Sequence, residues 1–551
     1  MNTPASSRKL RGGYYTSPEL AAILCEWAIR SAADAILEPS CGDGVFVIQA
    51  AKRAGTLRRK EAARRLGKIT GIEVNRAESQ KAIARMPSVS ASSLVEIVNA
   101  DFFTWRAKNA HRTFDCVVGN PPFIRYQNFP EPSRSKAMQL LADQGLSPNR
   151  LTNSWVPFLV GAMSLLRERG CLAMVIPAEI LQVSYAAQVR GFLADHFAKL
   201  DVIACNEMFF TNAEQEVVLL LADGFTRCPH AATECVIDLQ QHSDLSSIVS
   251  KKSPLLRSPG EHKHLQHENE KWLKYFLSGA EIELMRELRN APTITSLSTH
   301  AEVDIGIVTG NNEFFVLTRE QVEQFDVFEY ASPLIARSAH LKGAKITKED
   351  WRKLSHAGQR VFLFEVSKEI NGELSQAAKR YVRRGREAGV HEGFKCSIRK
   401  PWYSVPSVWS PDAFLFRQIY DFPRLIRNDL RAPSTDTIHR VRCKHDSSLV
   451  VENCYTYLTA ASAEIEGRSY GGGVLELEPT EAERLLVPET LQRALPLSEM
   501  DRLVRSGRLG DALDLNNKLV LQKSGISKRD CGRLKIIWDK MRQRRRMRKK
   551  L

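Results

Sequence analysis

The chain has 551 residues, more than one hydrophobic core usually accommodates, so we expect two or three domains. Hydrophobic residues make up 43% and charged residues 26% of the sequence, as is typical of soluble globular proteins, and no long apolar run predicts a membrane span. The formal net charge of +16 favours a polyanionic partner, although many basic proteins bind no nucleic acid.

The cysteines and the N-terminal residues bear on the cellular compartment. The 11 cysteines are scattered, and none forms a Cys-x-x-Cys pair or a Cys/His cluster with metal-binding spacing. This pattern is typical of reduced thiols in an intracellular protein rather than of a disulfide framework. The first residues also lack the apolar core of a secretory signal. We therefore expect a cytoplasmic protein that binds no metal ion and no membrane.

Short apolar strands alternate with helical stretches up to about residue 223. Helices are expected at residues 19–32 and 153–169, and a capping residue followed by Pro18 predicts the start of the first one. Alternation of this kind predicts an α/β fold with a parallel, doubly wound sheet. The expected strands are Ala35–Glu38, Lys68–Glu73, Val95–Asn99, Phe114–Gly119, Cys171–Ile176, Leu200–Cys205 and Glu216–Ala222.

The rest of the chain changes character twice. Residues 246–270 are rich in Ser, His, Lys and Pro, which predicts a linker after a first domain at 1–245. Residues 271–488 mix short strands, loops and helices, with aromatic and basic side chains interleaved. Residues 489–551 return to helical periodicity and close on a basic run, which is either a phosphate-binding arm or a solubilising tail.

An Asn-Pro-Pro-Phe turn at residues 120–123 is the strongest chemical signal. It follows an apolar strand, and ligands bind at the carboxyl ends of strands in open α/β sheets. An amine on an aromatic ring is a poor nucleophile, and acceptors for both of its N–H groups favour a pyramidal nitrogen. The Asn120 side-chain carbonyl and the Pro121 backbone carbonyl can be these acceptors.

The flanking residues of the turn fit the same chemistry. Two successive prolines, Pro121 and Pro122, fix φ and hold the acceptors in place before reaction. Phe123 offers a flat face on which a base can stack, worth roughly 1–3 kcal/mol. The alternative is a rigid turn with a phenylalanine in the core.

A second signal lies upstream, where a strand ending at Glu38 leads into a loop containing Cys41 and Gly42. Glycines let the backbone pass close to a ligand, and the spacing differs from the G-x-G-x-x-G of dinucleotide binders. The next strand ends in Glu73, where a carboxylate can take both hydroxyls of a ribose. These features predict a nucleoside site, although a Gly-Asp-Gly loop alone is often an ordinary turn.

Two weaker elements accompany these. Asp101 and Phe102 follow a third strand, where the acid could contact the amino group of an adenine and the ring could pack on it. The alternative is an Asp that caps a helix. Tyr15 and Thr16 precede the first helix and could close over the far end of a nucleoside ligand.

In this order, the four elements resemble the amino-methyltransferases of bacterial restriction–modification systems. More narrowly, the chain resembles the N6-adenine DNA methyltransferases of gamma type, in which the cofactor motifs come first and the target-recognition domain last. The resemblance covers about the first 225 residues. It implies a class I S-adenosylmethionine-dependent methyltransferase domain with a Rossmann-like, seven-stranded sheet, followed by a mixed α+β DNA-recognition domain over residues 271–488.

The resemblance also assigns roles to residues. A second aromatic residue is expected against a flipped base, with Phe210 favoured over Phe209, and Ser17 interrupts the usual Thr-Pro pattern at Thr16. The implied binding site for S-adenosylmethionine consists of Tyr15, Thr16, Glu38, Cys41, Gly42, Glu73, Asp101 and Phe102. The implied catalytic residues are Asn120, Pro121, Pro122, Phe123 and Phe210.

The resemblance implies that the chain methylates N6 of an adenine that has rotated out of duplex DNA. It also suggests, as a second partner, a separately encoded restriction endonuclease acting on the same site. Loops bearing Trp402, Tyr403 and Arg427 are candidates for reading bases.

Other activities fit parts of the sequence. The same turn occurs in enzymes that methylate RNA bases or a protein glutamine, although some 300 residues after the catalytic domain favour DNA. N4 of cytosine is a minor alternative, and so is a non-catalytic DNA-binding specificity protein. We find no Asp…Glu-x-Lys arrangement of a nuclease, so a fused restriction enzyme is not expected.

Overall fold

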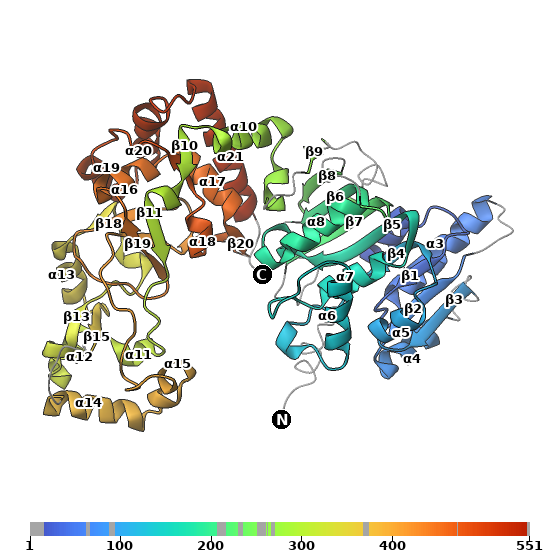
Figure 1. Cartoon of the computed structure of the whole chain (residues 1–551), viewed down its shortest axis with the longest axis horizontal. Coiled ribbons are helices and arrows are strands. Elements are labelled where there is room, and N and C mark those ends of the chain that lie inside the picture. Colours follow the sequence, from blue (N-terminus) through green and yellow to red (C-terminus); the bar gives the residue numbers. More distant parts are fainter. Residues whose placement is uncertain are drawn as a thin grey trace. The chain divides into compact units, whose positions relative to one another are not determined.

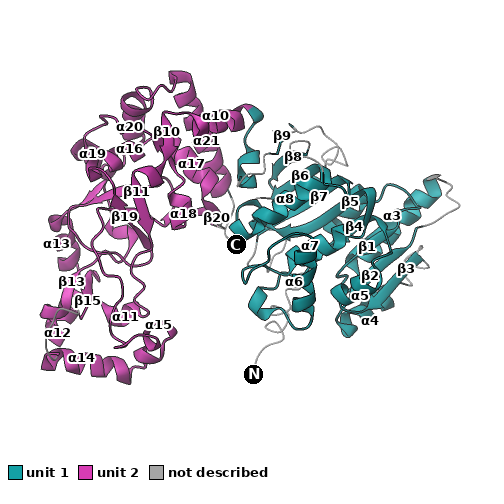
Figure 2. Ribbon diagram, in the orientation of Figure 1, with its two compact units in different colours: residues 1–279, 547–551 teal, residues 280–546 magenta. Residues whose placement is uncertain are grey.

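The computed structural model divides into two compact units, residues 1–279 with 547–551 and residues 280–546 (Figure 2). The finer division into four parts stays a prediction. Among the described residues, no helix is long and apolar enough to cross a bilayer, and no three His, Cys, Asp or Glu side chains cluster as metal ligands do. The structure describes residues 16–61, 67–86, 94–205, 216–229, 235–250, 261, 263–265, 270–366, 374–470 and 472–547.

A single sheet organises the first unit (Figure 1). Among the described residues it has nine strands in the order β3-β2-β1-β4-β5-β7-β6-β8-β9. Strands β1 to β5 are parallel neighbours, and β7 is antiparallel to both β5 and β6. The strands are β1 Ile36–Glu38, β2 Ile69–Glu73, β3 Val95–Asn99, β4 Phe114–Gly119, β5 Leu166–Pro177, β6 Phe197–Cys205, β7 Val217–Phe225, β8 Val236–His242 and β9 Lys263–His264.

The expected α/β sheet is therefore confirmed, with two strands more than the seven expected. Strand β8 pairs in parallel with β6, and the short β9 pairs with β8. Neither strand has a continuous apolar sequence: β9 consists of Lys263 and His264, and β8 carries polar residues from Gln240 onwards. Both strands lie at the end of the sheet. Apolar runs predict buried central strands better than they predict strands at an edge.

The helices of the first unit form two groups. Helix α2 packs on α3 and on β4 and β5, whereas α5, α6 and α7 contact one another. The side-chain oxygen of Ser17 accepts the Leu20 N–H at 3.3 Å and Pro18 stands in the first turn, which confirms the expected start of α2. The helices are α2 Pro18–Ala28, α3 Val45–Glu61, α4 Arg76–Arg85, α5 Phe102–Lys108, α6 Ser133–Asp143, α7 Trp155–Met163, α8 Ala187–His196 and α9 Leu245–Ser250.

The helix expected over residues 153–169 is shorter in the structure. Helix α7 ends at Met163, and β5 already begins at Leu166. Arg169 has a positive φ of 62°, and the β4–β5 register shifts at Phe114 and Cys116. The apolar pattern therefore belongs to two elements, a buried helix and the start of a long strand, which periodicity alone does not separate.

The second unit contains several small sheets. Among the described residues, β11-β19-β16-β18-β14 forms a five-stranded sheet, and β12-β15-β13 and β17-β21-β20 form three-stranded ones (Figure 1). The two-stranded pair is β10-β22. The strands are β10 Ile294–Ser296, β11 Ala301–Asp304, β12 Val316–Leu317, β13 Ala331–Pro333, β14 Lys345–Ile346, β15 Phe362–Phe364, β16 Ala413–Phe416, β17 Gln418–Ile419, β18 Leu425–Asn428, β19 Ile438–Cys443, β20 Arg468–Tyr470, β21 Val474–Glu476 and β22 Leu486–Pro488.

Helices surround these sheets and give the mixed α+β character that was expected. The helices of this unit are α10 Gly279–Asn290, α11 Asn312–Phe315, α12 Arg319–Phe325, α13 Lys348–His356, α14 Gln376–Glu387, α15 Phe394–Ser397, α16 Ser447–Cys454, α17 Tyr457–Glu466, α18 Pro479–Ala482, α19 Leu497–Arg505, α20 Leu509–Asn516 and α21 Lys528–Arg546. Helices α17 and α21 pack against each other.

The closing basic run begins within α21, and two of its arginines, Arg544 and Arg545, are buried in this unit. Arg545 is 1% exposed, and its guanidinium donates to the Glu464 carboxylate of α17 at 2.6 and 3.0 Å. It also donates to the backbone carbonyls of Gly473 and Tyr420. For Arg545, both earlier interpretations, a phosphate-binding arm and a solubilising tail, are wrong, because a buried cation bound in this way is a structural element.

We predict that Arg545→Ala weakens this unit by about 3–5 kcal/mol, since it leaves the Glu464 carboxylate buried without its cation. Hydrogen exchange of the α17 and α21 amides measures the loss. Arg546→Ala is the matched control, because Arg546 is half exposed in its pair with Asp421 and should cost at most about 1 kcal/mol. Equal losses for the two variants would contradict the prediction.

Candidate active site

The carboxyl ends of three neighbouring strands form one edge of the first unit's sheet. Strands β2, β1 and β4 are parallel and adjacent, so the loops that follow them lie side by side. The Asn-Pro-Pro-Phe turn follows β4, the loop with Cys41 follows β1, and Glu73 ends β2. The fold thus brings together the three strongest sequence signals.

Two hydrogen bonds tie Asn120 to residues far away in sequence. Its side-chain Nδ2 donates to Thr16 Oγ1 at 3.1 Å, and its backbone carbonyl accepts from Ser40 Oγ at 3.4 Å. Thr16 itself is buried. The bond to Thr16 fixes which end of the Asn120 amide is the acceptor end. The structure therefore joins two predicted site residues, Thr16 from before α2 and Asn120 from after β4.

Ser154, directly before α7, holds the other half of the turn. It is fully buried, its hydroxyl donates to the Pro122 carbonyl, and the same oxygen accepts the Ile124 N–H at 2.8 Å. Its backbone N–H also donates to the Ile124 carbonyl at 2.9 Å. One of the three bonds ends on the turn and two end on Ile124 directly after it, so Ser154 fixes the path of the chain where it leaves the turn.

The side chain of Phe123, the aromatic residue of the turn, is buried. Phe123 is 8% exposed and Pro121 is buried, whereas Asn120 and Pro122 are half-buried. Tyr15 and Phe210, the latter expected as the second aromatic residue, lie outside the described residues, as does Phe209. Their predicted roles stay predictions.

Backbone hydrogen bonds order the loop after β1 around Glu73. The Cys41 N–H donates to the Ile72 carbonyl at 2.8 Å, and the Gly42 N–H donates to Glu73 Oε2 at 2.9 Å. The Asn75 N–H donates to Glu73 Oε1 at 2.7 Å. Burial raises the pKa of the Glu73 carboxyl, and these two N–H donors act in the opposite direction. Each Glu73 oxygen keeps a further lone pair for a ligand hydroxyl.

Gly42 adopts the left-handed conformation, with φ of +52°, and a Cβ there would meet nothing within 4 Å. Because Gly42 has no side chain, the space above the loop is open. Cys41 is buried beside it, and burial raises the pKa of its thiol, as do Glu38 and Glu73. A neutral thiol in this position fills space and is not a nucleophile.

Glu38, the last residue of β1, is a buried acid between the two loops. It is 1% exposed, and neither of its carboxyl oxygens has a hydrogen bond of good geometry to another described residue. Burial raises its pKa well above the usual range, the charges of Glu73 and Asp43 raise it further, and the nearby Ser40 backbone N–H lowers it. A Cβ at Gly119 would come within 2.8 Å of Glu38 Oε1, so the carboxyl lies directly against the end of β4.

Asp101 and Phe102 have structural partners. Asp101 Oδ1 accepts from the Thr104 backbone and hydroxyl at 2.8 and 2.7 Å, and Oδ2 accepts from Ser133 Oγ at 2.7 Å. The acid therefore caps α5, the alternative left open by the sequence. The Phe102 ring is buried and stacks on Phe158 at 5.3 Å. Contacts of either residue with an adenine stay a prediction.

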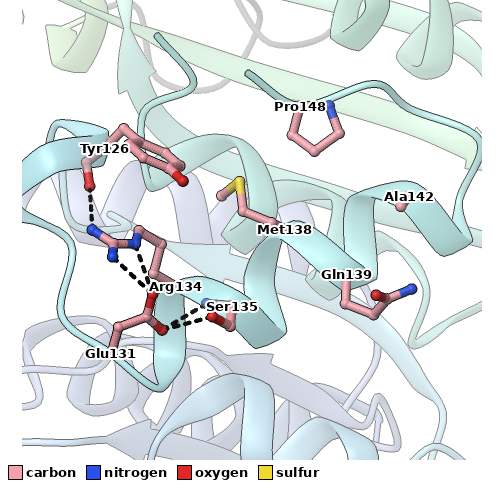
Figure 3. A pocket seen from close by; sticks show the side chains of 8 residues that line it. All are labelled: Tyr126, Glu131, Arg134, Ser135, Met138, Gln139, Ala142 and Pro148. Carbon is pink, nitrogen blue, oxygen red and sulfur yellow. Dashed lines mark hydrogen bonds and ion pairs between the residues drawn. The ribbon is translucent and has the colours of Figure 1, made fainter. Parts of the chain in front are cut away.

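A shallow groove lies beyond the turn, between the short helix Tyr126–Asn128 and α6 (Figure 3). Arg134 pairs with Glu131 at 2.8 Å and lies 5.0 Å from the centre of the Tyr126 ring. None of the predicted site residues lines this groove of about 390 Å³. It is thus distinct from the edge formed by β1, β2 and β4.

The strand order now identifies the class of fold. A doubly wound sheet in which an antiparallel β7 lies between β5 and β6 is the sheet of class I methyltransferases. The family "N-6 DNA Methylase" matches residues 1–285, and "Type II methyltransferase M.Eco57I, C-terminal domain" matches residues 269–521. The chain belongs to the N-6 DNA methylase family and is a DNA methyltransferase of the restriction–modification type.

Individual relatives carry related names. "Type II methyltransferase M.AccI" of Acinetobacter calcoaceticus is 23% identical over 529 residues, which is 92% of each chain. "Type II methyltransferase M.TthHB8I" of Thermus thermophilus is 27% identical over 227 residues, 40% of this chain and 47% of that protein. The crystal structure of the type IIG restriction endonuclease BpuSI has a TM-score of 0.42 and 12% identity, over 99% of this chain and 67% of that one.

Sequence reasoning missed Ser154. A serine before an apolar helix predicts only a helix cap, but this one has no capping bond to α7 and bonds to the turn 30 residues earlier. A local pattern carries no signal for such a contact. The positions of Glu38 and Glu73 at the ends of their strands depended on local patterns alone and could be predicted, whereas their roles stay predictions.

We predict that Ser154→Ala lowers kcat about tenfold and leaves cofactor affinity nearly unchanged. The buried Pro122 carbonyl and Ile124 N–H lose a partner, which costs about 1–3 kcal/mol, and 1.4 kcal/mol corresponds to about tenfold in rate. Steady-state methylation kinetics measure kcat and KM separately.

Ser164→Ala is the matched control at the other end of α7, where the hydroxyl donates to the Gly161 carbonyl at 2.7 Å. It should keep normal turnover. A wild-type kcat for Ser154→Ala, or an equal loss in both variants, would show that the turn does not depend on Ser154.

Proposed function

We propose that the chain transfers a methyl group from S-adenosylmethionine to N6 of an adenine that has rotated out of duplex DNA. The observation that carries this proposal is the Asn-Pro-Pro-Phe turn at the carboxyl end of β4, held by Thr16 and Ser154 beside the buried Glu38. Unpairing a base costs a few kcal/mol, which contacts in a pocket can offset.

The residues around Glu38 fit the cofactor. S-adenosylmethionine carries a sulfonium and an ammonium group, and a buried carboxyl without a hydrogen bond of good geometry to another described residue suits a cation. Glu73 keeps acceptor capacity for a ribose diol, and the open space at Gly42 admits a ligand close to the backbone. We assign Thr16, Glu38, Cys41, Gly42 and Glu73 to this site; the predicted contributions of Tyr15, Asp101 and Phe102 rest on the family resemblance.

When bound, the cofactor supplies a methyl group on a positively charged sulfur. Asn120 Oδ1 and the Pro121 carbonyl accept the two N–H groups of the target amine, which directs its lone pair at that methyl. The Phe123 ring stacks on the base, with Phe210 as the proposed second face. No strong general base is needed, because the methylated nitrogen becomes acidic and loses its proton to solvent.

Adenine is the proposed base because the turn begins with Asn, whereas an initial Ser favours N4 of cytosine in the family that the sequence resembles. The proposed partners are duplex DNA and a separately encoded endonuclease that cuts the same unmodified site. We propose that the protein acts in the cytoplasm. Methylation of rRNA or of a protein glutamine is the main competing activity.

We predict that Asn120→Ala reduces methyl transfer by orders of magnitude and keeps cofactor affinity, since it removes an acceptor that acts on the amine. Asn128→Ala, eight residues later on an exposed helix, should behave as wild type. Transfer of labelled methyl groups to DNA, rRNA or peptide identifies the substrate, and sequencing that detects modified bases identifies the base. Near-normal DNA methylation by Asn120→Ala would contradict the role of the turn.

Glu38 leads to a prediction about pH. Its raised pKa means that the ligand-free carboxyl is protonated over a pH range in which an ordinary glutamate is ionised. Binding a cation favours the ionised form, so binding releases a proton below that raised pKa. Affinity for S-adenosylmethionine should therefore rise with pH and level off once the pH passes the pKa of the free protein.

Calorimetry in buffers of different ionisation enthalpy measures the proton released. Glu38→Gln should weaken binding and abolish the release, because an amide does not titrate. Glu19→Gln, at an exposed position on α2, is the control and should keep both. Binding without proton release in the wild type would argue against Glu38 as the partner of the cationic group.

A further inference from the structure

Helix α14 lies in the second unit (Figure 1). It has one apolar face and one basic face. The apolar face is buried and packs against the cluster of Phe314 and Phe364, so it holds the helix in place. It consists of Ala377, Ala378, Tyr381 and Gly385. Five of the remaining eight positions are basic, Lys379, Arg380, Arg383, Arg384 and Arg386, and the other three are Gln376, Val382 and Glu387.

A groove of about 530 Å³ runs between this basic face and the loop that contains Trp402. Among the described residues that line it, five are cationic and none is acidic. Like charges placed this close repel one another, which a polyanion in the groove would relieve. The lining residues are Lys379, Val382, Arg383, Arg386, Arg399, Lys400, Pro401, Trp402 and Tyr403.

Three of these cations are available to a partner. Arg383, Arg386 and Lys400 are exposed, and no ion pair joins any of them to another described residue. Arg399 differs, because its guanidinium donates to the carbonyls of Val308 and Thr309, each at 2.7 Å. It therefore braces the wall of the groove, while the other three face solvent.

The aromatic residues of the groove are engaged with the protein. The Trp402 ring lies 5.2 Å from Phe314 and 5.7 Å from Tyr403. Both are half-buried and support the loop. Arg427, the third residue considered for base reading, is bound to Asp429 at 2.6 and 3.0 Å. The structure gives all three side chains partners inside the unit.

We propose that this groove binds the phosphate backbone of duplex DNA and adds affinity without reading its sequence. The inference rests on the proposed function for the choice of DNA as the polyanion. Exposed, unpaired Lys and Arg side chains contact phosphates, which carry no sequence information directly. Each phosphate neutralised releases condensed counterions, so the groove contributes to the salt dependence of binding.

An anionic membrane is the competing partner for a basic helix, and Phe394 beside the groove is 74% exposed. A helix lying on a bilayer inserts its apolar face, however, and that face of α14 is already buried in the unit's core. The apolar face of α14 is therefore not available for insertion into a bilayer, whereas the charge of the groove is exposed.

The test compares two triple variants of the full chain. The first removes the groove's cations with Arg383→Gln, Arg386→Gln and Lys400→Gln. The second removes the same charge from the same unit with Lys523→Gln, Lys528→Gln and Arg529→Gln, which are exposed and lie outside the groove. Binding is measured from low to high salt with two unmethylated duplexes. One contains the sequence that the chain methylates, and the other does not.

For the groove variant we expect weaker binding to both duplexes by the same factor, and a slope of log affinity against log salt lower by about 2 to 3. At low salt it should still methylate DNA, at the wild-type positions. The control should keep the wild-type slope. An unchanged slope in the groove variant, an equal change in the control, or altered methylation positions would overturn the proposal, as would groove-dependent binding to phosphatidylglycerol vesicles in preference to DNA.

These outcomes are separate from a failure of the proposed function. If the wild-type chain transferred no methyl group to DNA, the proposed reaction would be wrong whatever the variants did. If it methylated DNA with an unchanged salt slope in the groove variant, the assignment of the groove alone would be wrong.

Discussion

The site depends on a close approach that glycine alone permits. Strand β4 ends against the buried carboxyl of Glu38, where any side chain at Gly119 would come within 2.8 Å of an oxygen atom. This contact puts the end of the β1 strand and the Asn-Pro-Pro-Phe turn within one small volume. Thr16 and Ser154 then hold the turn from two sides. The arrangement is rigid before any ligand arrives, which is how a protein lowers the entropic cost of orienting two reactants.

Charge is distributed differently in the two units. In the first, Glu38 is buried at the end of β1 and Glu73 is half-buried at the end of β2, and burial raises the pKa of both. In the second, cations line an exposed groove on α14, and Arg545 is buried in an ion pair. Buried acids suit a small cationic ligand and exposed cations suit a polyanion. A methyltransferase that acts on DNA needs a site for each kind of ligand. The net charge of +16 is summed over all charged residues of the chain and is not a property of either site.

How much could be predicted from the sequence depends on how far apart in the sequence the interacting residues lie. The strands of the first unit, the start of α2 and the ordered motifs are local patterns, and the structure places Glu38, Glu73 and Asn120 on one edge as expected. Ser154 and Arg545 were not recognised, because their partners lie 30 and 81 residues away. Asp101 fitted both a ligand contact and a helix cap, and the structure shows the cap. The loop bearing Trp402 was a candidate for reading bases, and the contact of Trp402 with Phe314, 88 residues away in sequence, could not be predicted from the local pattern.

The ion pair between Arg545 and Glu464 has a consequence for synthesis of the protein on the ribosome. Its two members are separated by 81 residues, so the acid emerges well before its cation. Domains generally fold from the N-terminal side as the chain grows. The sheet of the first unit can therefore form while the second unit still lacks α21. Until that helix has been made, the Glu464 carboxylate has no arginine to pair with, so the nascent second unit keeps this acid exposed to solvent or leaves α17 unpacked.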